Sequence, residues 1–460
     1  MLLNNNLHTN PCKTIHIESI LAGYTPAQRS NMAYIIYFFA LSTSLFAVTM
    51  EELIDLGLKQ NTAIEQSRLQ TQQAQLQHQQ SQIEQYGSLD FTGEYLHYNT
   101  PRTLAPLTPS AIGSGTPIAT TEDLFSGGIT YSIPLFTGFE QTKQIEIHAL
   151  SEQTAHMQHK LTQEQLVYDI KALYLAILTQ QEIKNAQHAY TLALKKLENQ
   201  IAYEVQLGKK AKIDLIKARS DLRASQTQEA IFQSNVAITK ATLASLAGLE
   251  KITSVSSFDI TVKKPEYNAD KLQGNAAHLT KLKIKDIEVQ KAAKTIEKSK
   301  SSKLPKVNLS SYAGKNYGKD ELLHNWDNET LWQAGINVKW NIIDFGKQKT
   351  EIQKAKIAKM QAQFEKQQAW LDLKKILVES IEKINQSYEA YKGNSAQLKL
   401  LKESENIENV RYQNGVSTLN DLLLAKGKTH LAHAQLIQSK FEYQKNIYSL
   451  EYILETGAGQ

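Results

Sequence analysis

The chain has 460 residues, of which 41% are hydrophobic and 21% are charged, and its formal net charge is +5. Lys and Glu are interspersed along segments with helical periodicity, which is typical of a solvated face and argues against a nucleic-acid-binding surface. The modest hydrophobic content, with frequent Gln between residues 60 and 85, favours long helices with narrow apolar stripes over one thick core.

The only strongly hydrophobic run covers residues 33–48. It is short for a membrane-spanning helix, which needs roughly 20 residues. Small residues near its end predict a signal peptide over residues 1–47, cleaved after Ala47, with an anchor helix or a buried helix as alternatives. Residues 1–31 could belong to an over-extended reading frame. Cleavage would remove the single cysteine, Cys12, and with it any thiol for a disulfide, a nucleophile or a metal site.

A first structural repeat is predicted over residues 48–250. It begins with a helix over residues 50–85, where apolar residues recur at helical spacing. Alternating apolar and polar residues then predict two strands, over residues 89–95 and 125–135. The stretch between them, residues 101–123, is rich in Pro, Ser, Thr and Gly and predicts a loop.

A long helix is predicted from about residue 137 to 206, because no proline occurs there and apolar residues step by four and three, as in coiled coils. Such a helix would be about 105 Å long. Gly208 then marks a tight turn, where a glycine can adopt a positive φ. A second helix is expected to return from this turn to about residue 248.

The same order of elements begins again after a connector over residues 251–270, and a second structural repeat is predicted over residues 271–457. Its predicted elements are a helix over 271–300, a weaker strand over 307–313, a loop over 316–330, a strand over 332–342, a helix over 347–414 and a final helix to residue 454.

The two predicted turns are related by a fixed offset. A shift of 207 residues pairs Gly208 with Gly415 and Asp214 with Asp421, and it also aligns the strands that precede the two long helices. The spacing from strand to turn is therefore identical in both halves. The sequence predicts a mixed α and β protein built from a duplicated unit of helix, strand, strand, helix and helix.

The predicted strands carry large apolar residues on one face and small or polar residues on the other, which is the pattern of a transmembrane barrel around water. An antiparallel sheet packed on a helical core would show the same alternation. Trp332 and Trp340 lie about 26 Å apart along one strand. We expect them near the two interfacial girdles of a membrane, with Tyr131 as a further aromatic residue of the barrel interface.

Four strands cannot close a barrel, and an open sheet edge in lipid would leave backbone groups without hydrogen-bond partners. A membrane-embedded sheet of this size therefore requires a homo-oligomer. Three copies would supply 12 strands.

Three motifs follow one another along the chain: LIDLGLKQN at residues 53–61, PLFTGF at 134–139 and RYQNGVSTLNDLLLA at 411–425. In this order they resemble the outer membrane efflux protein family, the TolC-like trimeric export ducts, over residues 48–457. The resemblance implies a homotrimer with a 12-stranded barrel in outer-membrane lipid and a long helical coiled-coil tunnel in the periplasm. It also implies a passive conduit in tripartite efflux or type I secretion, served by an inner-membrane pump or transporter through a periplasmic adaptor (membrane fusion protein).

The resemblance further implies that both turns lie at the periplasmic entrance, where the inner helix pair closes the tunnel. Asp421 matches the acidic ring of the family's entrance. Leu424 stands where better-known members have a second acidic residue, so a single carboxylate ring is expected. Tyr412 matches an aromatic residue of the closed entrance. Ser417 replaces the family's arginine, so the salt bridge that this arginine makes is not expected here.

Simpler roles remain open for these residues. Asp421 and Asp214 could only stabilise the start of a returning helix, where a carboxylate offsets the helix dipole. Gly208 and Gly415 are expected to be structural turn residues.

Other candidate sites are weaker. His156 and His159 share a helix face and could present two imidazoles to a metal ion, but a solvated face is the simpler interpretation and no metal or cofactor is expected. Lys209, Lys210 and Lys212 could dock an adaptor or could simply be solvated. The sequence has no phosphate-binding loop, nucleophile elbow or zinc-protease motif, so an enzyme is not expected. A coiled-coil scaffold without a channel is the alternative function.

Overall fold

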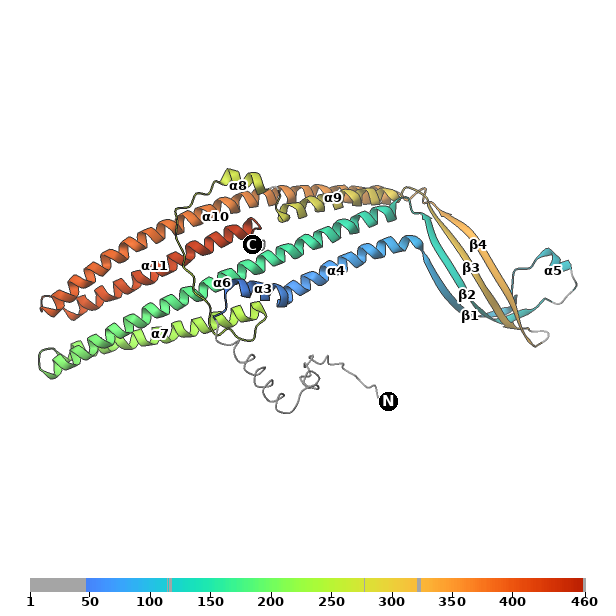
Figure 1. Ribbon diagram of the computed structural model, residues 1–460. Helices are drawn as coiled ribbons and strands as arrows, with labels where there is room; N and C mark the ends of the chain where they lie inside the picture. The colour runs from blue at the N-terminus through green and yellow to red at the C-terminus, as the bar shows by residue number, and fades with distance from the viewer. Residues whose placement is uncertain (1–46, 114, 116–117, 277, 321–323, 458–460) are drawn as a thin grey trace, which may run out of the picture.

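The computed structural model describes residues 47–113, 115, 118–276, 278–320 and 324–457. The predicted signal peptide lies outside these residues, apart from Ala47. Figure 1 shows an elongated molecule in which long helices lead into a sheet at one end. Within the described ranges, no helix is both long enough and apolar enough to cross a membrane.

The helical part of the first half consists of α3 (Met50–Gln60), α4 (Thr62–Ile83), α6 (Glu140–Gln206) and α7 (Lys212–Ala247). The prediction of one helix over residues 50–85 is wrong at Asn61, where the helix is interrupted and a new one begins. The Asn61 side chain accepts a hydrogen bond from the Ala63 amide at 2.8 Å and so caps α4. It also donates to the Leu246 carbonyl oxygen at 2.8 Å, which joins the end of α7 to the start of α4.

The second half repeats this arrangement with α8 (Ala269–Ala276), α9 (Thr280–Ser301), α10 (Lys347–Gln413) and α11 (Leu419–Ile453). Both long helices, α6 and α10, contain 67 residues. The end of α11 meets the start of α9, because the Glu455 carboxylate accepts hydrogen bonds from the Thr280 and Lys281 amides at 2.7 and 3.1 Å. A carboxylate at this position also offsets the dipole of α9.

The sheet is antiparallel in the order β1–β2–β3–β4. Its strands are β1 (Ser88–Thr103), β2 (Thr120–Phe136), β3 (Lys306–Lys319) and β4 (Trp326–Lys339); a 3-10 turn, η2 (Glu84–Tyr86), precedes β1, and a short helix, α5 (Pro109–Gly113), lies between β1 and β2.

The strands are longer than predicted, and the two predicted loops are correspondingly too long. β1 continues through Pro101, which lies at a register shift between His97 and Arg102 where the ladder does not need its missing N–H. β3 runs on to Lys319. β4 already begins at Trp326 but ends at Lys339, so residues 340–342 of the predicted strand lie outside it. Turn-forming residues in these stretches therefore did not mark the strand ends.

The two faces of the sheet differ as predicted. Phe91 pairs with Ile129 and Ala313 with Trp332 on one face, and the side chains of Phe91 and Trp332 are each 79% exposed. The opposite face is mostly polar or small, with Leu96, Leu124 and Leu331 as exceptions, and there the Tyr312 ring fills the space above Gly128 and Gly314. The sheet extends from the helix ends rather than packing across them, so the alternative of a sheet on a helical core is wrong (Figure 1).

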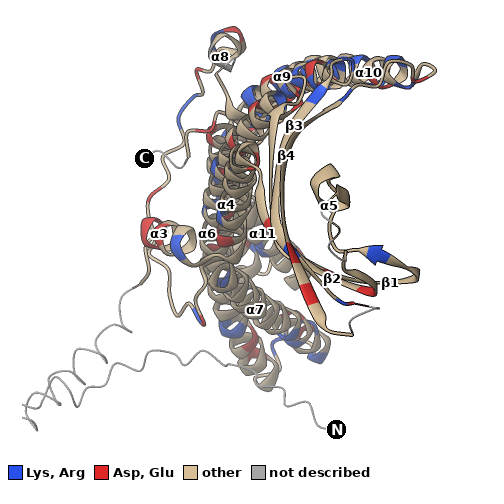
Figure 2. Ribbon diagram, turned by 90° about the vertical axis from the view of Figure 1, so that its right-hand side faces the viewer, with Lys and Arg blue, Asp and Glu red and all other residues tan. Residues whose placement is uncertain are grey.

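The helices form a curved wall, with α3 and α8 on its convex side (Figure 2). Near the sheet the order across the wall is α4, α6, α9 and α10; farther away it is α7, α6, α11 and α10. The largest buried cluster surrounds Ile170 and Tyr174 of α6, and the Tyr174 hydroxyl donates to the Ser256 carbonyl oxygen at 2.5 Å. A parallel bridge between Val48 and Val255 holds the connector against the start of the described chain.

Candidate functional site

The two helical hairpins end side by side at the tip farthest from the sheet (Figure 1). Their turns have the same geometry, with φ values of 70° at Gly208 and 72° at Gly415. In each, the amide after the glycine donates to a carbonyl oxygen five residues earlier: Lys209 to Glu204 and Val416 to Arg411, both at 2.9 Å. These contacts close both helices with the Schellman arrangement, in which a left-handed residue is required.

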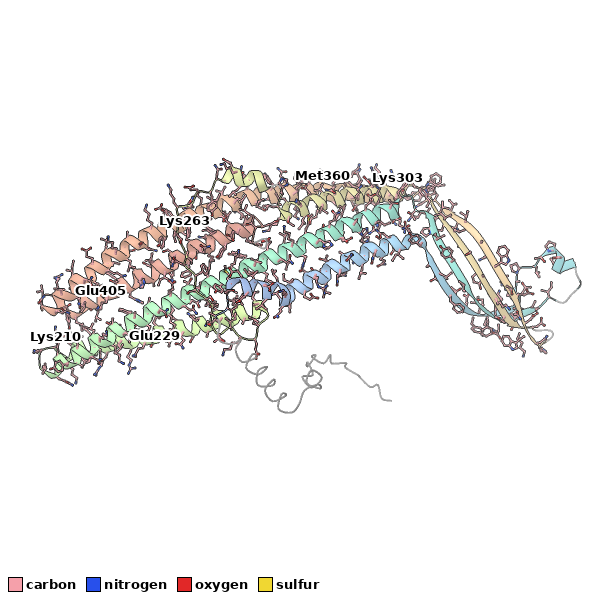
Figure 3. The ribbon with its side chains drawn as sticks, viewed as in Figure 1. Lys210, Glu229, Lys263, Lys303, Met360 and Glu405 are labelled. Carbon is pink, nitrogen blue, oxygen red and sulfur yellow. The ribbon has the colours of Figure 1, made fainter. Side chains whose placement is uncertain are left out.

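Tyr412 is the residue that joins the two tips. It comes from α10, is 4% exposed, and lies in a cluster with Leu197 and Ile201 of α6 and Leu422 of α11. Figure 3 shows Lys210 at the tip of the first hairpin. Its ammonium lies 4.3 Å from the centroid of the Tyr412 ring, a cation–π geometry. Burial raises the pKa of the Tyr412 hydroxyl to about 12, with smaller contributions from Glu204 and Asp214.

Asp421 lies in the first turn of α11 and makes a reciprocal cap with Thr418. Its Oδ2 accepts from the Thr418 amide and hydroxyl at 3.0 and 2.7 Å, while its own amide donates to Thr418 Oγ1 at 3.2 Å. These bonds, followed by the charge of Arg411, lower the pKa of the Asp421 carboxyl. The carboxylate is thus a helix cap and an exposed anion together.

Asp214 is placed differently, although it occupies the matching position in the first hairpin. The N-cap of α7 is Ala211, which has no side-chain acceptor, and the Asp214 amide bonds the Ala211 carbonyl oxygen at 3.0 Å. The two tips therefore have the same backbone geometry, but only the second has a side-chain cap at the start of its returning helix.

Three buried polar atoms at the second tip lack a hydrogen-bond partner within the described residues: Tyr412 Oη, Ser417 Oγ and Glu408 Oε1. Buried polar groups are normally satisfied, so their concentration at one tip needs a reason. One reason would be that this surface rearranges or binds a partner, because the three atoms would then form their hydrogen bonds in the rearranged or bound state.

A second group of polar residues, which sequence reasoning did not identify, lies in the seam between the hairpins. Gln187 of α6 is 3% exposed and donates to Ser225 Oγ of α7 at 2.8 Å. His430 of α11 bonds Gln187 Oε1 through Nε2 at 2.7 Å and stacks on Tyr190, with ring centroids 4.5 Å apart. Burial, followed by the charge of His433, lowers the pKa of His430.

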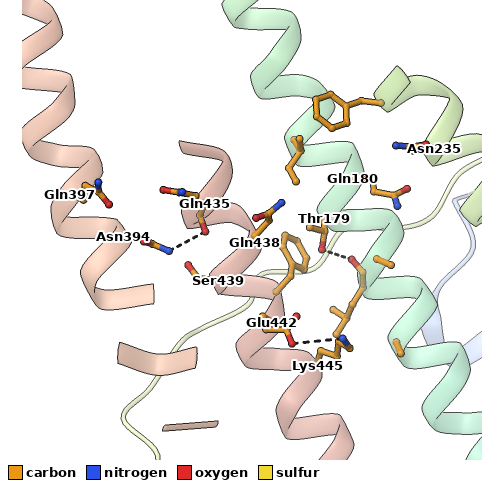
Figure 4. Close-up of a pocket in the computed structure, with 16 residues that line it drawn as sticks. Thr179, Gln180, Asn235, Asn394, Gln397, Gln435, Gln438, Ser439, Glu442 and Lys445 are labelled. Atoms are coloured by element: carbon orange, nitrogen blue, oxygen red, sulfur yellow. Dashed lines mark hydrogen bonds and ion pairs between the residues drawn. The ribbon is translucent and has the colours of Figure 1, made fainter. Parts of the chain in front are cut away.

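A groove of about 950 Å³ lies between α6, α7, α10 and α11 (Figure 4). Its α6 residues, such as Ala176 and Thr179, are on the face opposite Tyr174, so the groove opens on the concave side of the wall. The lining is rich in carboxamides, and Asn394 donates to the Gln435 carbonyl oxygen at 3.2 Å. Such a surface offers hydrogen bonds without net charge.

The remaining candidates do not converge on a site. His159 bonds Ser67 Oγ at 2.7 Å, whereas His156 lies 3.9 Å from Glu152. Across the part of the chain that the structure describes, no group of three or more His, Cys, Asp or Glu residues could hold a metal ion. Of the lysines at the first tip, Lys209 and Lys212 are exposed and only Lys210 packs on an aromatic ring.

The aromatic residues predicted for a barrel interface lie along the apolar face of the sheet. Trp332 is in the middle of β4, Trp340 lies just beyond this strand, and the Tyr131 hydroxyl donates to the Tyr86 carbonyl oxygen at 3.0 Å. A further aromatic cluster lies toward the other end of the sheet, where Phe125 is 4.7 Å from Tyr95 and 5.8 Å from Trp326. Sequence reasoning missed this cluster because three separate strands contribute to it.

A family model described as outer membrane efflux protein matches residues 53–249 and 277–454. Comparison with curated proteins finds no match. Among solved structures, the chain is similar to CusC, with a TM-score of 0.74, 15% identity and coverage of 88% of this chain and 91% of that chain.

Two further solved structures are similar over most of their length. VceC from Vibrio cholerae has a TM-score of 0.70, 15% identity and coverage of 89% of this chain and 96% of that chain. The open state of MtrE from Neisseria gonorrhoeae has a TM-score of 0.70, 16% identity and coverage of 89% of both chains. At such identities the likeness concerns the fold.

Proposed function

The chain belongs to the outer membrane efflux protein family, and from this membership we propose that it is the passive outer-membrane conduit of a tripartite efflux or type I secretion system. It is an outer-membrane efflux channel by family, and its relatives are channels and not enzymes. An inner-membrane pump would deliver substrates to it through a periplasmic adaptor. The observation that carries the proposal is the union of a sheet with an apolar outer face and a curved helical wall that ends in two adjacent tips.

The duct would be a homotrimer. Strands β1 and β4 are the two edges of the sheet in one chain, and three copies joined edge to edge would close a barrel of 12 strands. In this assembly the β1 edge of one copy pairs with the β4 edge of the next. Such a contact between two different surfaces closes into a ring of three copies when each copy is rotated by a third of a turn from its neighbour.

Exposed apolar residues at the two edges of the helical wall support the same assembly. On α4, large exposed apolar side chains recur every seven residues, at Leu69, Leu76 and Ile83. The opposite edge carries Ile357, Phe364, Leu371 and Val378 on α10, again at seven-residue spacing. Two such stripes on neighbouring copies can pack as a coiled coil.

The helical tips would lie in the periplasm and form the entrance. Because its pKa is lowered, the Asp421 carboxyl is ionised at neutral pH, and three copies would place a ring of negative charge there. Tyr412 would hold the second hairpin against the first in the closed duct. Adaptor docking at the tips would supply partners for the unpaired polar atoms of Ser417 and Glu408.

Planar-bilayer recording of the purified protein tests this function. We expect cation-preferring conductance, reduced in preference by Asp421→Asn, which removes the charge but keeps an amide oxygen for the Thr418 cap. Asp214→Asn is the matched control on the first tip. A detergent-extracted trimer that never conducts, with or without Asp421→Asn, would instead support a coiled-coil scaffold.

A further inference from the structure

The junction between the sheet and the helices differs in charge between the two halves. In the second half it consists of residues 298–306 and 339–349, which together contain seven lysines and one acidic residue. The corresponding segments of the first half, residues 80–88 and 132–142, contain no lysine and two glutamates. The two junctions share a backbone path, so this difference is not required by the fold.

The two lysine-bearing segments form one surface. The indole N–H of Trp340 donates to the Lys303 carbonyl oxygen at 3.0 Å, and Gln348 Nε2 donates to the Ser302 carbonyl oxygen at 2.9 Å. Figure 3 places Lys303 where α9 meets the sheet.

Three of the seven lysines are already engaged or face the other way. Lys298 donates to Gln144 Oε1 at 2.6 Å, and Lys306 pairs with Glu140 at 2.5 Å. Lys339 is the register partner of Lys306, on the face opposite to the apolar one. The other four are exposed and have no ion pair within the described chain; we call them the lysine collar, and they are Lys300, Lys303, Lys347 and Lys349.

Exposed apolar side chains lie in the same stretch of chain as the collar. Trp340 is about half exposed, Ile343 is more so, and Phe345 is 99% exposed. Phe345 also has a φ of 51°, which is unfavourable for a residue with a side chain, and Gly346 follows at 97°. The matching turn of the first half has the same backbone, with φ values of 66° at Gly138 and 69° at Phe139, so the exposure of the Phe345 ring is the feature that points to an external apolar partner.

These residues continue the apolar outer face of the sheet, because Ile336 and Val338 of β4 lead directly to them. Tryptophan is favoured at the boundary between hydrocarbon and head groups, and lysines beside a membrane attract anionic lipids. We propose that the lysine collar and the adjoining Trp340, Ile343 and Phe345 bind an anionic phospholipid of the inner leaflet of the outer membrane. The lysines bind its phosphate, and the apolar side chains contact its upper acyl chains.

This proposal rests on the proposed function only in placing the sheet in the membrane. Each copy carries its own collar, so a trimer binds three such lipids, all in the leaflet nearest the helices. The first half has no equivalent site because its junction carries no lysine.

Native mass spectrometry of the purified full-length protein tests the proposal, with phosphatidylglycerol or phosphatidylethanolamine added separately, and with phosphatidylglycerol in competition with inorganic phosphate. The test variant changes all four collar lysines to Gln. The control variant changes four exposed lysines far from the sheet, Lys195, Lys196, Lys209 and Lys212, to Gln. We expect phosphatidylglycerol to remain bound to the wild type and the control, and retention to fall about tenfold in the collar variant.

Equal retention in the collar variant would overturn the proposal, and so would equal binding of phosphatidylethanolamine. Displacement of the lipid by millimolar inorganic phosphate would identify a site for the free anion instead. Channel conductance is measured on the same samples and is expected to be unchanged in the collar variant. A loss of lipid with intact conductance therefore separates this proposal from the proposed function.

A second measurement does not depend on the lysines. Trp340 is one of four tryptophans, and replacing the other three, Trp326, Trp332 and Trp370, with Phe leaves it as the only reporter. In vesicles of brominated phosphatidylglycerol, its fluorescence is expected to be quenched more by bromine near the head group than by bromine near the chain end. Absence of quenching, or stronger quenching by the deep bromine, would contradict the placement of Trp340.

Discussion

His430 donates a hydrogen bond from Nε2 to Gln187 Oε1 over 2.7 Å, and this bond connects the second hairpin directly to α6. Gln187 in turn donates to Ser225 of α7, so three helices from both halves share one buried polar group. The stacked Tyr190 lies near the charges of Asp221 and Glu405. Buried polar groups of this kind fix how two helices align, because any sliding leaves donors and acceptors unpaired.

The seam at His430 is expected to weaken as the pH falls. Burial lowers the pKa of His430 below its ordinary value of 6.5, so the packed state binds a proton less readily than an exposed histidine does. Its contribution to stability is therefore complete above pH 6.5 and is lost as the pH falls below that value. Burial, followed by the charge of Lys402, also lowers the pKa of the neighbouring His433 and outweighs the opposing charge of Glu182, so His433 acts in the same direction.

Melting temperatures at pH 7.5 and 5.5 check this expectation. The wild type should lose more stability on acidification than His430→Gln, which cannot titrate. His156→Gln serves as the control, because His156 is an exposed residue of α6. The same acid sensitivity in His430→Gln and in the wild type would show that the seam is not the titrating element.

Two substitutions test the ring and the hydroxyl of Tyr412 separately. Tyr412→Phe should be neutral or slightly stabilising, because the buried hydroxyl has no hydrogen-bond partner within the described residues. Tyr412→Ala empties the cluster between the tips and should destabilise it by roughly 3–5 kcal/mol, the usual range for truncating a buried aromatic residue. Single-channel recording should then show more frequent opening for Ala only; a similar effect of Phe would mean that the hydroxyl matters.

The edge of α10 should control assembly. Phe364 is 65% exposed in one copy, and a charge there would be buried without a partner if this edge meets α4 of the next copy. Phe364→Glu is thus expected to convert detergent-extracted trimers to monomers in light scattering. Gln363→Glu adds the same charge one residue earlier on an exposed position and should leave the trimer intact. Trimers in both variants would contradict the predicted contact.

Two glycines with nearly the same φ should respond differently to alanine. A Cβ at Gly87 would lie 1.9 Å from the Ser132 carbonyl oxygen, whereas one at Gly415 would have nothing within 4 Å. Gly415→Ala should therefore lose only about 1–2 kcal/mol from its left-handed backbone. Gly87→Ala must displace β2 and should fail to give folded protein. The yield of heat-resistant trimer on gels measures the effect of both substitutions, and equal yields for the two variants would contradict the steric argument.

The sequence was sufficient for the two long helices and the two hairpin turns, because periodicity and glycine position report local geometry directly. The prediction of one helix over residues 271–300 is wrong, because α8 ends at Ala276 and α9 begins at Thr280, after Leu279 in an extended conformation. The sequence also failed at Asn61, where a capping residue followed by Thr62 was available as a signal but was outweighed by the apolar spacing on both sides. It also failed at Pro101, since a register shift inside a strand depends on the partner strand.

The site was predictable only in part. The Asp421 cap follows from local sequence and was anticipated as an alternative role. The contact of Lys210 with Tyr412 and the bond of His430 to Gln187 join residues about 200 or more positions apart. Such pairs depend on how the two hairpins align with each other, and no local pattern reports that alignment.

The joints at Asn61 and Glu455 have a mechanical consequence. The wall therefore contains two kinds of helix. α6 and α10 run unbroken for 67 residues each, or about 100 Å. α7 and α11 instead end where α4 and α9 begin. A bending load along the wall is therefore expected to be carried mainly by α6 and α10, because the other helices meet at hydrogen-bonded joints and not through a continuous backbone.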